Sequence, residues 1–165
     1  AGMKRVAWIA AGIALLALIG MPRGKRSDVA ELVPVQALII DAEQGKITIT
    51  TDTGDTGSGA SLDAAFSDLR AGCAGQLFTQ TAEHVLLTAR AWYLMPQVSV
   101  SQQLRPAAKL YRVVGQAPQA QPALEFLQAH PGNLTLSHTR AALLENRQVQ
   151  APQLVQTEGG LRLGR

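Results

Sequence analysis

The longest uncharged stretch of the chain, Val6 to Met21, most limits what this sequence can fold into. It is 16 residues long. As a helix it would span about 24 Å, which approaches the roughly 30 Å hydrocarbon core of a bilayer. Long basic side chains can bridge the difference by reaching the headgroups, and such residues flank both ends of the stretch: Lys4, Arg5, Arg23, Lys25 and Arg26. The sequence therefore predicts an N-terminal transmembrane helix, with residues 1–26 acting as a membrane anchor.

Two other interpretations of this stretch carry less weight. A secretory signal has the same basic start and apolar middle, but no convincing small-x-small cleavage site precedes Pro22. A buried core helix rarely has charge clusters on both flanks. Leu18–Met21 is similar to a bacterial lipoprotein box in which Met21 replaces the lipidated cysteine. A helix derived from such a signal would place the following domain outside the membrane, whereas the basic residues after it favour a cytoplasmic domain.

Composition narrows the classes of function. The net charge is +3, and much of the excess comes from the basic residues that flank the apolar stretch. The remainder is close to neutral and has no cluster of lysine and arginine, which argues against a nucleic-acid partner. The single cysteine, Cys73, cannot form an internal disulfide. About one domain fits into residues 27–165.

Hydrophobic periodicity predicts the elements of this domain. Val35–Ile40 and Lys46–Thr51 are typical of strands, and the link Ala42–Gly45 predicts a four-residue hairpin loop between them. The glycine-rich stretch Thr53–Gly59 is expected to be a flexible loop. Ser61 can cap a helix that Gly72 ends.

The second half of the domain alternates in the same way. Further predicted elements are a strand at Glu83–Thr88, a helical connection within Ala89–Gln103 interrupted at Pro96, a strand at Lys109–Val114, a helix starting at Pro122 and stopping at Pro131-Gly132, a helix at Leu136–Asn146, and a weak hairpin at Leu154–Leu163. This order predicts an α+β fold: the transmembrane helix, then a mixed sheet with helices packed mainly on one face. Residues 27–165 would form a single domain, with 134–165 left open as a truncated start of a further unit.

The search for chemistry gives few candidates. His84, His130 and His138 are widely spaced and have only Cys73 to join them, so we expect no metal site. A nucleophilic Cys73 paired with a histidine defines an anchored hydrolase as a low-ranked hypothesis. The stronger interpretation is structural, because Cys73 lies between Gly72 and Ala74 in a loop after a helix, where a small residue suffices. We therefore expect no catalytic residues, no cofactor and no enzymatic activity.

Acidic and basic groups give similarly weak signals. Asp41, Asp52 and Asp55 lie around the glycine-rich stretch but lack the spacing of an EF-hand loop. Gly54–Gly59 lacks the lysine of a phosphate-binding loop. A second set, Arg105, Lys109 and Arg112, lies near one predicted strand. It could bind an acidic partner, although an ordinary polar sheet face is the favoured interpretation.

The order of segments resembles the Ger(x)C family, the C subunits of the nutrient germinant receptors of spore-forming bacteria. The similarity runs from Asp28 to Gly164 and covers only the N-terminal part of that family, because members are about twice this length. It rests on Asp28–Leu32, Ala37–Asp41, Gly45–Ile49, Ala60–Phe66 with Leu69, Glu83–Leu87 and Leu104–Gly115. Met21 departs from the pattern at the place of the lipidated cysteine.

The resemblance implies a non-enzymatic domain on the outer face of the inner spore membrane, in contact with integral membrane subunits. The leading hypothesis is therefore a membrane-anchored component of a spore germination or sporulation complex that acts through protein–protein contacts. The alternative is an oligomerising, ring-forming domain of a trans-envelope sporulation or secretion assembly, with copies of itself as partners. Neither hypothesis requires a nucleic acid or a small-molecule substrate.

Overall fold

Seven strands form one mixed sheet in the computed structural model, which describes residues 32–164. The predicted membrane helix lies outside the described residues. Within the described part, no helix combines the length and apolarity that crossing a bilayer requires. The order across the sheet is β4 (Thr56–Gly59), β3 (Lys46–Thr51), β2 (Ala37–Glu43), β6 (His84–Thr88), β7 (Lys109–Val114), β8 (Gln153–Thr157) and β9 (Gly160–Gly164).

The centre of the sheet is parallel and its flanks are antiparallel. Strands β2, β6, β7 and β8 run parallel to one another, with Ile40 opposite Leu87 and Val113 opposite Leu154. Every residue of β6 is buried, as expected of a parallel strand covered on both faces. A separate pair of short parallel strands, β1 (Leu32–Pro34) and β5 (Gln76–Phe78), was not predicted from the sequence.

The predicted hairpin of β2 and β3 is confirmed, but its loop is shorter than expected. Ala42 pairs with Ile47 and Glu43 with Lys46, so that only Gln44 and Gly45 form the turn. Both have positive φ, at 51° and 78°, which is the backbone of the two-residue turns that match strand twist. The prediction of a four-residue loop at Ala42–Gly45 was therefore wrong.

The prediction of a flexible loop across Thr53–Gly59 was also wrong in its second half. Thr56–Gly59 is the edge strand β4, paired with β3. The helix α2 (Leu62–Gly72) packs directly on this strand. A Cβ at Gly57 would overlap the backbone nitrogen of Leu69, and one at Gly59 would lie 2.6 Å from the Cβ of Ala64. The glycines are thus needed for close packing in a strand.

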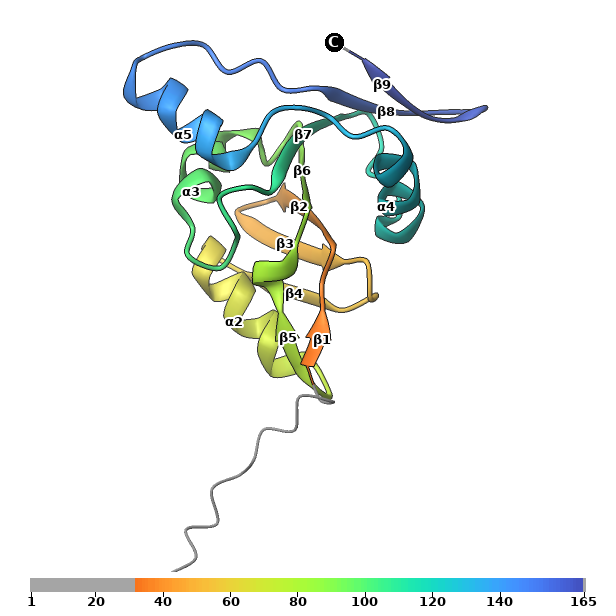
Figure 1. Cartoon of the computed structure of the whole chain (residues 1–165). Helices are drawn as coiled ribbons and strands as arrows, with labels where there is room; N and C mark the ends of the chain where they lie inside the picture. Colours follow the sequence, from red (N-terminus) through yellow and green to blue (C-terminus); the bar gives the residue numbers. More distant parts are fainter. Residues whose placement is uncertain (1–31, 165) are drawn as a thin grey trace, which may run out of the picture. The chain divides into compact units, whose positions relative to one another are not determined.

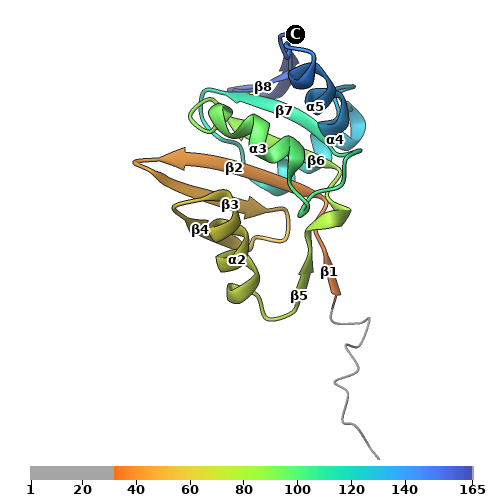
Figure 2. The same cartoon turned by 90° about the vertical axis from the view of Figure 1, so that its left-hand side faces the viewer.

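Four α-helices occur in the described residues, and three lie on one face of the sheet (Figures 1 and 2). These are α2, α3 (Met95–Val100) and α5 (Leu136–Leu144), which supply Phe66, Val98 and Leu136 to one core. The fourth, α4 (Ala120–Ala129), packs Ala123 and Leu127 against the opposite face. Two 3-10 turns, η2 (Thr79–Thr81) and η3 (Trp92–Leu94), connect the remaining elements.

The predicted mixed α+β class is confirmed, with small differences at the helix starts. α4 begins at Ala120, two residues before Pro122, and Pro96 belongs to the first turn of α3. Proline fits there because the first turn leaves its backbone N–H groups unused in any case. The stretch 134–164 supplies α5 and the last two strands of the same sheet, and it belongs to the unit that spans Glu31–Arg165.

Candidate interaction groove

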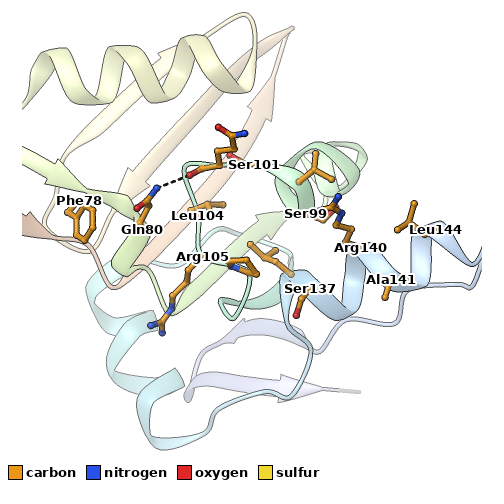
Figure 3. Close-up of a pocket in the computed structure, with 14 residues that line it drawn as sticks. Phe78, Gln80, Ser99, Ser101, Leu104, Arg105, Ser137, Arg140, Ala141 and Leu144 are labelled. Carbon is orange, nitrogen blue, oxygen red and sulfur yellow. Dashed lines mark hydrogen bonds between the residues drawn. The ribbon is translucent and has the colours of Figure 1, made fainter.

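A groove of about 690 Å³ runs between α3, α5 and the end of β5, and we call it the α3–α5 groove (Figure 3). Its lining comes from Phe78, Gln80, Ser99, Val100, Ser101, Gln102, Leu104, Arg105, Pro106, Leu136, Ser137, Arg140, Ala141 and Leu144. Buried leucines form its floor, because Leu104 and Leu136 are 4% and 1% exposed. A hollow of this size is within the usual range for binding sites.

The short helix α3 brings Val100 to the groove. Val98 and Ser99 are buried, and the Ser99 hydroxyl donates to the carbonyl of Pro96 at 2.8 Å. These contacts fix the last turn of the helix. Val100, its final residue, is left 55% exposed beside the hollow.

The helix α5 forms the opposite wall. The Thr135 hydroxyl caps it by accepting from the backbone N–H of His138 at 3.2 Å. The buried Thr139 donates its hydroxyl to the Thr135 carbonyl at 3.0 Å. Leu136 and Ala142 face the interior, whereas Leu144 at the end of the helix is 77% exposed. Leu144 therefore adds an exposed apolar side chain to this wall.

The end of β5 completes the groove. Phe78 is 41% exposed and pairs with Pro34 of β1. Hydrogen bonds from the next two residues hold the loop that follows α3. The Thr79 hydroxyl donates to the Gln103 carbonyl at 2.8 Å, and the Gln80 side-chain amide donates to the Gln102 carbonyl at 3.1 Å. These bonds tie the backbone of the loop after α3 to the residues that follow β5.

The charge of the lining is entirely positive. Arg105 and Arg140 contribute guanidinium groups, and none of the lining residues is acidic. Arg105 forms an ion pair with Glu83 at 3.1 Å, yet its Nε is buried and has no hydrogen-bond partner. Arg140 is exposed and forms no ion pair with any residue in the range 32–164. Arg140 is thus available to a negatively charged group, whereas Arg105 already has Glu83 as its counter-charge.

The three basic residues singled out from the sequence are separated by the fold. Arg105 lines the groove, whereas Lys109 and Arg112 lie on β7. Lys109 and Arg112 are three residues apart on this strand, so their side chains point to opposite faces of the sheet. Lys109 shares the face of Tyr111, and Arg112 shares the face of Leu110. Arg112 lies over the ring of Trp92, 5.5 Å from its centroid. The set does not form one basic face.

The three histidines lie in different places. His84 is buried at the start of β6, where its Nδ1 is 3.1 Å from the hydroxyl of Tyr111. His130 is exposed after α4 and stacks on Phe126, with the ring centroids 4.8 Å apart. His138 is exposed on α5. Nowhere in residues 32–164 do three or more His, Cys, Asp or Glu side chains gather as metal ligands would.

Cys73, the candidate nucleophile, follows α2 and is half-buried. Its thiol donates to the Leu69 carbonyl at 2.9 Å. Burial raises the pKa of this thiol to about 11, and the nearby carboxylate of Asp55 adds to the increase. Cysteine acts as a nucleophile in its thiolate form, so this environment disfavours catalysis by Cys73.

The three aspartates considered as calcium ligands have separate structural roles. One Asp52 carboxylate oxygen accepts from the backbone N–H groups of Gln36 and Ala37, both at 3.0 Å. Asp55 accepts from the hydroxyl of Thr53. Asp41 lies near the end of β2, opposite Thr48 of β3.

Asp41 belongs to a small polar cluster at the carboxyl ends of β2 and β6. It accepts from the hydroxyl of Thr88 at 2.5 Å and from Arg90 at 2.6 Å, and Arg90 also contacts Glu43 at 2.7 Å. Burial acts to raise the pKa of Asp41, but hydrogen bonds from Thr88, Ala42 and Arg90 outweigh it and lower the pKa. Every charged group of the cluster has a partner within it, and the two carboxylates share one guanidinium. These contacts give the cluster a structural role at this end of the sheet.

Sequence reasoning missed most of the groove. Phe78, Val100, Arg140 and Leu144 come from segments up to 66 residues apart. Only Arg105 was singled out, and for a different surface. The available signal was the pair Leu143-Leu144 near the end of the predicted helix Leu136–Asn146.

Comparisons with known proteins give this groove no precedent. No family model matches the chain, no curated protein matches it, and no solved structure matches it.

Proposed function

We propose that this chain is a membrane-anchored, non-enzymatic interaction module whose folded part binds another protein in the α3–α5 groove. The observation that carries the proposal is the concentration of exposed apolar side chains at one place. Five large apolar residues are exposed in the described part of the chain, and three of them, Phe78, Val100 and Leu144, line this groove. Scattered exposed apolar residues need no explanation, but a grouped set beside a hollow is typical of an interaction site.

The position of the groove along the chain is consistent with a partner at the membrane. Phe78 pairs with Pro34, which lies 13 residues after Met21, the end of the predicted membrane helix. A fully extended chain of that length reaches about 45 Å. A domain held by the Val6–Met21 helix would thus present the groove within reach of integral membrane proteins.

The assembly stays a prediction that rests on the resemblance to the Ger(x)C family. On that prediction the partners are integral membrane subunits of a spore germination or sporulation complex, and the domain lies on the outer face of the membrane. The same prediction needs neither a cofactor nor a catalytic group. The raised pKa of Cys73 supports the non-enzymatic part of the proposal.

The proposal is tested by making the groove polar in the full chain. In the double variant Val100→Asp, Leu144→Asp, both positions are exposed, so we expect the stability to change by no more than about 1 kcal/mol in total. Solubilised membranes of the source organism are applied to the immobilised wild-type chain, the double variant and Arg162→Glu, a control on β9 outside the groove. We expect the same membrane protein to bind the wild type and the control, and to be lost with the double variant.

A result in which all three chains capture the same proteins, or none captures any, would contradict the proposal. Circular dichroism of each variant checks that a loss of binding is not a loss of folding.

The alternative function, a ring-forming domain that binds copies of itself, is favoured by one separate feature. Among the strands of residues 32–164, β9 (Gly160–Gly164) is the last of the sheet and pairs only with β8. The free edge of such a strand can accept a strand from another chain. Light scattering on the full chain in detergent distinguishes the two functions, since this alternative requires a closed oligomer and groove binding does not.

A further inference from the structure

The chemistry of the α3–α5 groove indicates the kind of segment that fills it. We infer that its occupant is an amphipathic helix of a partner protein that carries carboxylates beside its apolar face. This inference rests on the proposed function and adds the chemical class of the partner.

The apolar part of the argument comes from the walls. Phe78, Val100 and Leu144 surround a floor made of Leu104 and Leu136. They are supplied by a strand end and two helices that pack against each other. A groove beside two packed helices suits a third helix, whose side chains at positions i, i+3, i+4 and i+7 form one apolar stripe. Figure 3 shows the labelled side chains of α3 and α5 along this hollow.

The charged part comes mainly from Arg140. The lining contains two guanidinium groups and no carboxylate, and Arg105 is already paired with Glu83 outside the lining. A basic or neutral partner would therefore leave Arg140 without a counter-charge. Arginine favours carboxylates because its planar group donates two parallel hydrogen bonds.

The next hollow along α3 limits where these carboxylates can lie. It has a volume of about 480 Å³, shares Val100, Ser101 and Gln102 with the groove, and contains Asp63 of α2. A carboxylate on the partner is therefore favoured near Arg140 and disfavoured near Asp63. The bound helix is expected to have its acidic residues grouped on one part of its length.

The test is a selection of peptides against the full chain in nanodiscs of phosphatidylcholine. A phage library of random peptides, about four helical turns long, is first depleted on empty nanodiscs. We expect the selected peptides to carry apolar residues at helical spacing together with aspartate or glutamate. Arg140→Glu is expected to weaken their binding about fivefold to tenfold, and Leu144→Asp about tenfold or more. Arg162→Glu serves as the matched charge-reversal control and should bind as the wild type does.

Three outcomes would overturn the inference. Selected peptides that lack carboxylates, or that bind Arg140→Glu as well as the wild type, would exclude an acidic partner. A fluorophore can be attached at position 144 through Leu144→Cys in a Cys73→Ser background. If its emission changes when phosphatidylglycerol is added to the nanodiscs without peptide, the occupant is a lipid surface. Conversion of an oligomer into a monomer by Leu144→Asp would identify a second copy of the chain.

These outcomes are distinguishable from a failure of the proposed function. If the groove captures a membrane protein but shows no preference for acidic peptides, the function stands and the partner class is wrong. If acidic helices bind in the groove but no membrane protein depends on it, the chemistry stands and the proposed function is wrong.

Discussion

One buried polar network shows how single residues shape this domain. Tyr111 is fully buried, and its hydroxyl accepts from the backbone N–H of Gly132 at 2.9 Å. The same oxygen lies 3.1 Å from Nδ1 of His84. Because the phenol has one proton to donate, an unprotonated Nδ1 completes the network. His84 is therefore expected to be neutral in the folded protein.

This network predicts a dependence of stability on pH. Burial lowers the pKa of His84, with further lowering by Lys109 and Arg105 that Glu83 partly opposes. The unfolded chain, with an ordinary histidine pKa near about 6.5, binds a proton that the folded chain does not. The free energy of unfolding should then fall as the pH drops below about 6.5. One proton contributes at most about 1.4 kcal/mol per pH unit.

Urea unfolding at several pH values between about 7.5 and 5 checks this prediction. The variant His84→Gln keeps a side chain that can hydrogen bond to Tyr111 but cannot be protonated in this range. It should lose less stability than the wild type on acidification. Equal slopes for the two proteins would mean that His84 is not the responsible group.

Among the elements, β4 and α2 depend most on close packing of their two backbones. Phe66 and Leu69 of α2 are buried against the sheet, and β4 contributes glycines where the helix backbone comes nearest. The local sequence of β4, with two glycines in four residues, does not favour a strand. Its conformation is set by pairing with β3 and by packing under α2.

We predict that Gly57→Ala destabilises the domain by about 1–3 kcal/mol or more, because the added methyl overlaps the backbone of α2. Gly72, the last residue of α2, is the matched control, since nothing lies within 4 Å of an added Cβ there. Gly72→Ala should be neutral or stabilising by up to about 1 kcal/mol. Thermal unfolding measures both, and equal effects would contradict the packing argument.

The difference between elements set by local pattern and elements set by packing explains which of them could be predicted from sequence. β3 alternates buried isoleucines with threonines, and α2 repeats its buried residues at helical spacing, so periodicity alone finds both. β1 and β5 are three residues long and have too few positions to show a period. β4 has no apolar pattern. The groove was missed for a related reason, because exposure of Val100 and Leu144 depends on which faces the neighbouring elements cover.

At the scale of the whole molecule, the C-terminal strands decide whether the described residues unfold as one cooperative unit or as two. β8 pairs with β7, and its Leu154 is fully buried with Tyr111 and Val113. Two cores lie on the two faces of the sheet and share the strands between them. Residues 134–164 should therefore unfold together with the rest of the domain.

Leu154→Ala tests this coupling in the full chain. The loss of a buried leucine should cost about 2–5 kcal/mol, whereas Leu144→Ala in the groove should cost less than about 0.5 kcal/mol because that side chain is 77% exposed. In a Trp8→Phe background, the fluorescence of Trp92 reports on the face opposite to Leu154, and circular dichroism reports on all elements. With one cooperative unit, Leu154→Ala lowers the denaturant midpoint equally for both signals. If the midpoint of the Trp92 signal stays that of the wild type while circular dichroism shows an earlier transition, the last strands unfold as a separate unit, and the groove can keep its shape without them.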